Sequence, residues 1–311
     1  MLKKCFFPVA AALLLAANCF GAEGSSGGQF LRIGVGAKAS ALGESGAVSS
    51  GAQSLFYNPA GLGAVKNTEA AFSQVKWISD MNYSNLAFAK KAGAGVYGLA
   101  VSYLSMPSIQ KYNKFGAKLA DTYSASDMAV ALGYGRNLTA RTGLGMNIKY
   151  ISSKLESETA SAAAVDAGIK YEVLPEVLGA GLAVQNLGTP LKYIDKSAPL
   201  PLNVKLGAQY VFHIEGDSGQ RNKITVLSDL NHMRDSGFYG NFGLDLMVSY
   251  SEETSFSLRG GYKTNTSEKG SGFSAGFGLD MKNYAVDYAY SPMGNIGQAH
   301  RVTLTLRFPG G

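Results

Sequence analysis

Apolar residues recur at every second position along most of this chain, from residue 69 to residue 308. In HRVTLTLRF, residues 300–308, the residues Val302, Leu304 and Leu306 alternate with charged and hydroxyl side chains. A β-strand is the regular structure that sends successive side chains to opposite faces, so each such segment predicts a strand with one apolar face. Fourteen segments have this pattern: 69–77, 83–91, 94–104, 125–136, 141–153, 162–172, 177–186, 201–212, 222–231, 239–250, 254–263, 271–281, 283–291 and 299–308.

The lengths of these segments and of their connections favour a closed barrel in a membrane. Most segments have about 9 to 12 residues, the length at which a tilted strand crosses a bilayer. Outer-membrane barrels alternate longer outer loops with short periplasmic turns. The longer connections are 105–124, 154–161, 187–200 and 292–298; the short ones are 92–93, 137–140, 173–176, 251–253 and 282, and 213–221 is one longer exception.

The chemistry of the two strand faces supports the same fold. The apolar face often ends in an aromatic ring, as expected where a barrel wall meets lipid headgroups. These rings are Tyr103, Tyr134, Tyr150, Tyr171, Tyr210, Tyr250, Tyr262, Tyr290 and Phe308. The opposite face carries Lys149, Asp166, Lys170, Asp245, Arg259, Asp280, Asp287 and Arg301. A soluble sandwich is the alternative, but the even strand count and the alternating connections favour an all-β, membrane-spanning antiparallel barrel of about 14 strands with a polar lumen.

The first 21 residues form a separate segment. Lys3 and Lys4 precede an apolar run over residues 5–17 and then small residues, which predicts a secretory signal peptide at 1–21, cleaved after Gly21 or Ala22. Acylation of Cys19 is the alternative, although Asn18 before it is a poor match for a lipoprotein signal. Past this segment no run of 18 apolar residues exists, which excludes helical membrane spans.

Cysteine content and net charge limit the covalent links and the partners expected of the mature chain. Both cysteines lie inside the predicted signal, so we expect no disulfide after cleavage. Removing Lys3 and Lys4 leaves 26 basic residues against 22 acidic ones. A net charge of about +4 is too small to indicate a nucleic-acid partner.

Residues 22–68 lack the alternation, and the stretch LFYNPAGL at 55–62 suits neither helix nor strand. Pro59 lacks an amide proton and keeps Asn58 extended, while Ala60 and Gly61 leave room for another backbone. The side chain of Asn58 is expected to bond nearby backbone in a turn. We therefore predict that 22–68 form a hatch or plug inside a barrel spanning 69–308, with Asn58, Pro59, Ala60 and Gly61 as the gating residues.

Three stretches resemble the PorV/PorQ family of outer-membrane proteins, part of the broader FadL-like group. They are FLRIGVGAKASALGESGAVSSGAQSLFYNPAGL at 30–62, LGAGLAVQNLGTPLKY with LPLNVKLGAQY at 178–210, and LRGGYK with NYAVDYAYSPMGNIGQAHRVTLTLRF at 258–308. The resemblance implies a fourteen-stranded barrel with an N-terminal hatch. In FadL-like barrels an Asn-Pro-Ala in that hatch matches Asn58, Pro59 and Ala60 here.

The same resemblance implies two functions for a barrel in the bacterial outer membrane. PorV is associated with type IX secretion and receives protein cargo, which predicts a barrel that presents or passes a secreted client. FadL-type members pass small hydrophobic molecules, which is the alternative function; a barrel without transport is a third. The short outer loops and the end at Pro309, Gly310 and Gly311 depart from the family pattern. Expected partners are outer-membrane lipids, the barrel-assembly machinery, and either secreted cargo or a hydrophobic ligand.

Motifs for catalysis, cofactors and metals are weak in this chain. GFSAG at 272–276 fits a hydrolase pattern around Ser274, but it lies in an alternating strand and not at a strand-to-helix turn. GAGVYG at 93–98 precedes a strand and not a helix, and the three histidines are scattered. We expect Asp245 and Asp287 to form structural ion pairs, and we predict no enzyme activity, cofactor or metal site.

The longest outer connection, 105–124, carries the second group of candidate residues. Ile109, Tyr112, Phe115 and Leu119 interleave with Lys111, Lys114 and Lys118, which predicts one or two turns of amphipathic helix. Three roles are open for this connection: it caps the barrel mouth, it binds phosphates of the outer leaflet, or it contacts a protein partner. The candidate contact residues are Lys111, Tyr112, Lys114, Phe115 and Lys118; a solvated loop is the alternative.

Overall fold

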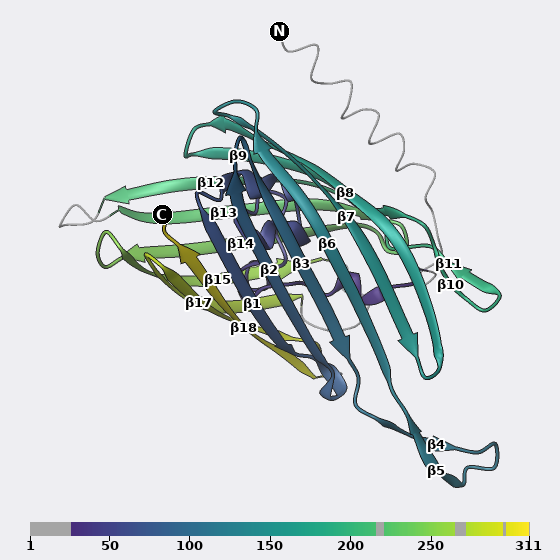
Figure 1. The fold of residues 1–311 in the computed structure, drawn as a ribbon. Helices are drawn as coiled ribbons and strands as arrows, with labels where there is room; N and C mark the ends of the chain where they lie inside the picture. The colour runs from purple at the N-terminus through teal and green to yellow at the C-terminus, as the bar shows by residue number, and fades with distance from the viewer. Residues whose placement is uncertain (1–25, 216–220, 265–271, 295–296, 311) are drawn as a thin grey trace.

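A computed structural model describes residues 26–215, 221–264, 272–294 and 297–310. The predicted signal peptide at 1–21 lies outside the described residues. Fourteen antiparallel strands close into a barrel in the order β1-β18-β17-β16-β15-β14-β13-β12-β9-β8-β7-β6-β3-β2 (Figure 1). The strands are β1 (Thr68–Lys76), β2 (Asn82–Ala92), β3 (Gly95–Ser105), β6 (Ala125–Asn137), β7 (Thr142–Leu155), β8 (Glu158–Leu174), β9 (Leu178–Gly188), β12 (Asn203–Glu215), β13 (Arg221–Met233), β14 (Gly237–Ser249), β15 (Thr254–Lys263), β16 (Phe273–Met281), β17 (Tyr284–Pro292) and β18 (Gln298–Phe308). Each of the fourteen predicted segments overlaps one of them, so the predicted fold class is confirmed.

The alternation places the two side-chain sets as predicted. In β18, Leu304 and Leu306 are exposed on the outer wall, whereas Arg301 and Thr303 are buried in the interior. The wall is thus apolar outside and polar inside. No helix among the described residues combines the length and the apolar character needed to cross a membrane.

The two ends of the barrel differ in their connections. The turn end, where β1 begins and β18 ends, has the short connections 93–94, 138–141 and 175–177. The loop end carries 106–124 and 189–202, each with a small separate hairpin: β4 (Ile109–Tyr112) with β5 (Lys118–Tyr123), and β10 (Leu191–Tyr193) with β11 (Lys196–Ala198). The predicted loop at 154–161 is wrong, since β7 and β8 extend to leave only 156–157 as a turn.

The predicted helix in 105–124 is also wrong, because this connection forms the β4–β5 hairpin. Asn113 Oδ1 accepts hydrogen bonds from the amides of Phe115 and Ala117, at 2.9 and 3.0 Å, and Gly116 has a φ of 79°. A side-chain cap and a left-handed glycine make a tight turn at the centre of the segment. That turn interrupts the helical pattern and pairs the flanking residues.

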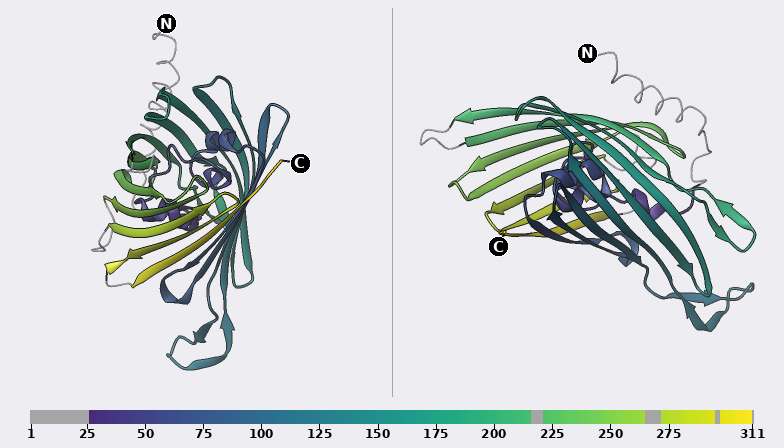
Figure 2. Two further views of the ribbon diagram at one scale, coloured as in Figure 1. Left: turned by 90° about the vertical axis from the view of Figure 1, so that its left-hand side faces the viewer. Right: turned by 45° about the horizontal axis from the view of Figure 1, so that its top comes forward.

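Residues 26–67, called the N-terminal segment below, lie inside the barrel (Figures 1 and 2). The segment contains short helices only: η2 (Gln29–Arg32), α2 (Ala37–Ala41), η3 (Ala52–Phe56) and η4 (Pro59–Ala64); a further turn, η5 (Ile78–Asp80), links β1 to β2. It enters at the loop end, where the Gly27 amide donates to Pro199 O at 2.8 Å. It leaves at the turn end, where Asn67 O accepts from the Lys91 amide at 2.7 Å.

Candidate functional site

Asn58 links the N-terminal segment to two strands of the wall. Its side chain is fully buried, and its Nδ2 donates to Ala47 O at 2.6 Å within the segment. The same nitrogen lies 3.2 Å from Ile169 O on β8 and 3.4 Å from Leu182 O on β9. Its Oδ1 accepts from the Ala60 amide at 3.1 Å and so caps η4, with Pro59 in the first turn. The local turn expected for Asn58 is therefore present, together with wall contacts that the sequence did not reveal.

Glycines of the wall receive the stretch around Asn58. A Cβ atom on Gly168 of β8 would collide with Asn58 Oδ1, and one on Gly145 of β7 would collide with the backbone of Pro59. On β9, a Cβ on Gly181 would collide with Ala47 O. We call Gly145, Gly168 and Gly181 the glycine seat. The absence of side chains there allows the two backbones to approach closely.

Within the segment, Ala60 and Gly61 also lie at close backbone contacts. A Cβ on Gly61 would collide with Ser49 O, and the Gly51 amide donates to Gly61 O at 3.2 Å. Ala60 is buried. The four residues predicted as a gating group, Asn58 to Gly61, thus form one buried turn against the wall, while their role in gating stays a prediction.

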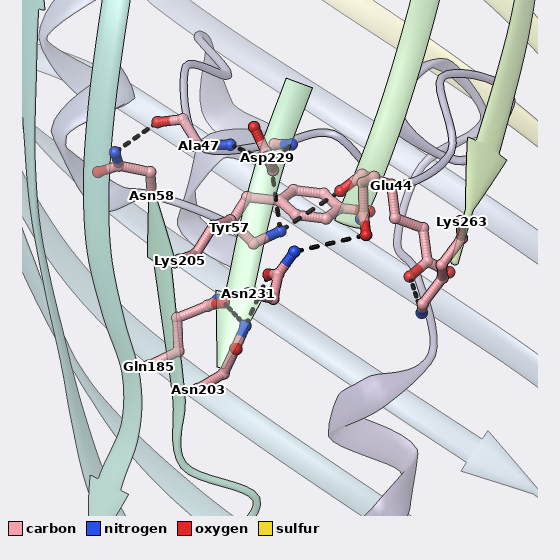
Figure 3. A network of polar contacts seen from close by, with 12 residues as sticks. Glu44, Ala47, Tyr57, Asn58, Gln185, Asn203, Lys205, Asp229, Asn231 and Lys263 are labelled. Atoms are coloured by element: carbon pink, nitrogen blue, oxygen red, sulfur yellow. Dashed lines mark hydrogen bonds and ion pairs between the residues drawn. The ribbon is translucent and has the colours of Figure 1, made fainter. Parts of the chain in front are cut away.

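A second anchor is the buried carboxylate of Asp229 on β13. Its Oδ2 accepts from the amides of Gly46 and Ala47, at 2.6 and 2.9 Å, and lies 3.7 Å from Lys205 Nζ (Figure 3). Lys205 Nζ also donates to Glu44 O at 3.3 Å and lies 5.1 Å from the centre of the Tyr57 ring. Charge-assisted bonds of this kind are stronger than neutral ones, so Asp229 orders the turn at 44–47.

Glu44 is the third anchor and the only acidic residue in 26–67. Its Oε2 accepts from Lys263 Nζ of β15 at 2.6 Å (Figure 3). Burial alone would raise the pKa of the Glu44 carboxyl, but Lys263 beside it, with Arg301 and Lys205 farther away, lowers that pKa below its ordinary value. The carboxylate is therefore charged at neutral pH, and its ion pair with Lys263 holds the segment against β15.

Other wall side chains bond the backbone of the segment at single points. Asn147 donates to Leu55 O at 3.1 Å, and Gln185 donates to Phe56 O at 2.9 Å. Lys170 donates to Ser49 O at 3.0 Å, and the amide of Ala37 donates to Thr303 Oγ1 at 2.8 Å. The lumen thus supplies the hydrogen-bond partners that this irregular backbone lacks internally.

Ser274 and the lumen carboxylates have structural contacts. Ser274 Oγ donates to Ala41 O and accepts from the Gly43 amide, each at 3.2 Å. The expected ion pairs are confirmed: Arg259 Nε lies 3.1 Å from Asp245, and its Nη1 lies 2.5 Å from Asp287. In the described ranges no cluster of His, Cys, Asp and Glu is arranged to hold a metal ion.

Cavities of different sizes remain around the N-terminal segment in the part of the chain that the structure describes. One of about 70 Å³ lies toward the loop end, lined by Leu55, Tyr83, Ser102 and Asn203 among others. Three others have volumes of about 170, 180 and 250 Å³. Those of about 170 and 250 Å³ lie toward the turn end. An apolar cavity of about 150 Å³ is large enough for benzene. The loop-end cavity is therefore too small for an aromatic molecule unless the segment moves.

The candidate residues of the outer connection lie on the β4–β5 hairpin, far from this site. Lys111 forms an ion pair with Glu156 of the β7–β8 turn, and this hydrogen bond raises the pKa of the Lys111 ammonium. Lys114 Nζ lies 5.1 Å from the centre of the Phe115 ring. Tyr112 and Lys118 are opposite each other in the hairpin. The structure therefore gathers these five residues on one projection, apart from Asn58 to Gly61.

Sequence reasoning missed Glu44 and Asp229 as anchors, and it assigned no contact with the segment to Lys205. One signal was available for Glu44, which is a single carboxylate in a segment rich in glycine and alanine. Asp229 had no such signal, because its partners Gly46 and Ala47 precede it by more than 180 positions.

Comparison with known proteins bears on the fold. No family model matches the chain, and no curated protein matches it. Among solved structures, the toluene transporter TbuX of Ralstonia pickettii aligns with 89% of this chain and 99% of its own, at 15% identity and a TM-score of 0.62. The toluene transporter TodX of Pseudomonas putida aligns with 92% of this chain and 98% of its own, at 11% identity and a TM-score of 0.58. A FadL homologue of Pseudomonas aeruginosa aligns with 85% and 96%, at 9% identity and a TM-score of 0.50. The chain therefore has the closed, fourteen-stranded fold of the FadL-like outer-membrane barrels.

Proposed function

We propose that this chain is a channel of a bacterial outer membrane that passes small hydrophobic molecules. The observation that carries the proposal is the barrel itself, which aligns over nearly the whole length of two structures described as toluene transporters. The outward apolar face supports a position in a bilayer. By the usual orientation of such barrels, the loop end faces the outside and the turn end faces the periplasm.

In this proposal the N-terminal segment is the hatch. It narrows the lumen at rest, and the loop-end cavity of about 70 Å³ admits no aromatic ligand while the segment stays in place. Asn58, Pro59, Ala60 and Gly61 keep the hatch against the glycine seat, and Asp229 and Lys263 hold its other turn. Passage of a ligand requires the segment to leave these contacts or to shift within the lumen.

The test is toluene permeation and ion conductance in liposomes containing the purified protein. Asn58→Ala with Pro59→Ala removes buried hydrogen bonds worth roughly 1–3 kcal/mol, so we expect the open population, and with it the conductance, to rise about five- to a hundredfold. The matched control makes the same two changes at Asn82 and Pro107, which are exposed. If the variant and the control behave alike, Asn58 and Pro59 do not gate the channel. If the wild-type protein passes no toluene, the channel function fails.

A second candidate function is secretion-associated presentation of a protein client, which rests on the resemblance to the PorV/PorQ family. None of the three solved structures supports it. Cross-linking in intact cells tests it: capture of a secreted protein, in a genome that encodes a type IX machine, would favour this function over hydrocarbon passage. A barrel that passes no toluene and captures no client would leave a structural role.

A further inference from the structure

The side chain of Tyr57 lies between two of the cavities inside the barrel. It lines both the loop-end cavity and the cavity of about 180 Å³, which we call the middle cavity. Of the four cavities described above, no other residue of the loop-end cavity lines a second one. The middle cavity in turn shares Ser50 with both cavities toward the turn end. Tyr57 therefore stands where the loop-end cavity meets the other three.

The middle cavity has the size and part of the lining that a single aromatic ring needs. Its volume of about 180 Å³ exceeds the roughly 150 Å³ of an apolar cavity that binds benzene. Leu42, Val48 and Leu227 line it and form a buried apolar cluster. Gln53 and Gln209 give it a polar side as well. A one-ring molecule thus fits beyond Tyr57, whereas it does not fit the loop-end cavity before it.

The two ends of the Tyr57 side chain are held by different parts of the N-terminal segment. Its hydroxyl donates to Val35 O at 2.7 Å and accepts from the Val35 amide at 2.9 Å. Val35 is buried, and in the described part of the chain no other group bonds these two atoms. The ring lies against Gly46, where a Cβ atom would collide with it, and near Lys205 (Figure 3). Its backbone is fixed next to Asn58, so the tip of the ring can be released while its base stays in place.

We propose that Tyr57 is a gate between the loop-end cavity and the middle cavity, and that it passes hydrophobic molecules of one ring. The gate opens when the hydroxyl leaves Val35, while Asn58 keeps the segment in the barrel. Two hydrogen bonds are lost in this movement, far fewer than in release of the whole segment from the wall. The space that the ring vacates joins both cavities. The proposal rests on the proposed function and reduces the shift within the lumen to one side chain and its neighbours.

The test measures the ion conductance of the purified full-length protein in planar bilayers. Tyr57→Phe keeps the ring but leaves the buried amide and carbonyl of Val35 unpaired, so we expect conductance to rise about five- to a hundredfold. Tyr57→Ala removes the ring and should raise conductance at least as far. The matched controls are Tyr193→Phe and Tyr193→Ala, which change a half-buried tyrosine that lines none of the four cavities. Both controls should conduct like wild type.

The width of the open passage distinguishes a local gate from release of the segment. A polyethylene glycol too wide for a one-ring passage lowers the conductance only of a pore that it can enter. It should leave the conductance of Tyr57→Ala unchanged, because the segment still narrows the lumen. Entry of the polymer into the Tyr57→Ala pore would show that the segment has left, and would overturn the local gate.

Equal conductance of wild type and the two Tyr57 variants would overturn the proposal, as would equal increases in the Tyr57 and Tyr193 variants. Mobility of heated and unheated samples on gels shows whether each variant keeps its barrel. Toluene permeation, measured on the same preparations, separates this proposal from the channel function. A wild-type protein that passes toluene, with Tyr57 variants no different from it, would overturn the gate and leave the channel function standing.

Discussion

The barrel wall and the N-terminal segment satisfy their backbones in opposite ways. In the wall, each strand pairs with two neighbours, as β18 does with β1 and β17. In the segment, the amides of Gly46 and Ala47 bond a carboxylate of β13, and Ala47 O bonds the side chain of Asn58. The backbone of the wall therefore finds its hydrogen-bond partners within the wall, whereas the conformation of the segment depends on side chains that the wall supplies.

This difference indicates which part of the molecule, the wall or the N-terminal segment, can move more easily. Breaking a wall hydrogen bond weakens a ladder that many neighbours support, but losing Asp229 or Asn58 removes an anchor with few replacements. The segment is thus the part of the structure expected to move while the barrel stays closed. A reporter for that movement is available: Ser45→Cys places a thiol at a buried position, in a chain whose two native cysteines are at positions 5 and 19.

Of the changes predicted here, loss of Asp229 should weaken the attachment of the N-terminal segment to the wall most strongly. Asp229→Ala leaves Lys205 buried without its carboxylate and frees two amides of the segment, at a cost of roughly 3–5 kcal/mol. We expect the thiol at Ser45→Cys to react with a maleimide over a hundredfold faster, with the barrel intact. Asp280→Ala is the control, since its pair with Arg307 is partly exposed to solvent and worth about 0–1 kcal/mol. Equal labelling rates would show that Asp229 does not anchor the segment.

A side chain in the glycine seat should have the next largest effect. Gly168→Val places carbon atoms where Asn58 Oδ1 lies, and overpacking of this kind costs roughly 1–3 kcal/mol. The expected result is a conductance in liposomes raised about five- to a hundredfold. Gly260→Val on β15 is the matched control, because nothing lies within 4 Å of a Cβ added there. A Gly168→Val protein that conducts like the control would mean that the wall, and not the segment, accommodates the new side chain.

The pH dependence of the Glu44 contact is the smallest expected effect. The pKa of the Glu44 carboxyl is below its ordinary value of 4.5 in the folded segment, so its pairing with Lys263 stabilises the segment fully above about pH 4.5. That contribution is lost as the pH falls through the folded pKa. The labelling rate at Ser45→Cys should therefore rise in acid more steeply for wild type than for Glu44→Gln. Identical pH profiles would exclude Glu44 as a charged anchor.

Much of the wall follows from local pattern. Val302, Leu304 and Leu306 were assigned to the outer face from their spacing alone, and their exposure confirms it. The position of the segment was inferred from the absence of that spacing in 22–68 and from the turn chemistry of Asn58 and Pro59. The helix expected around Lys114 failed because the cap by Asn113 and the conformation of Gly116 outweighed a weak amphipathic pattern.

The sequence by itself determined the number, order and facing of the strands, because a two-residue period is a local property that each strand carries alone. Only the tertiary structure decided which wall residues hold the N-terminal segment. Asp229 meets Gly46, and Gly168 meets Asn58, across more than 100 positions of chain, and no local periodicity encodes such a meeting. Closure of the barrel brings these residues together, and burial then makes their hydrogen bonds and charges decisive.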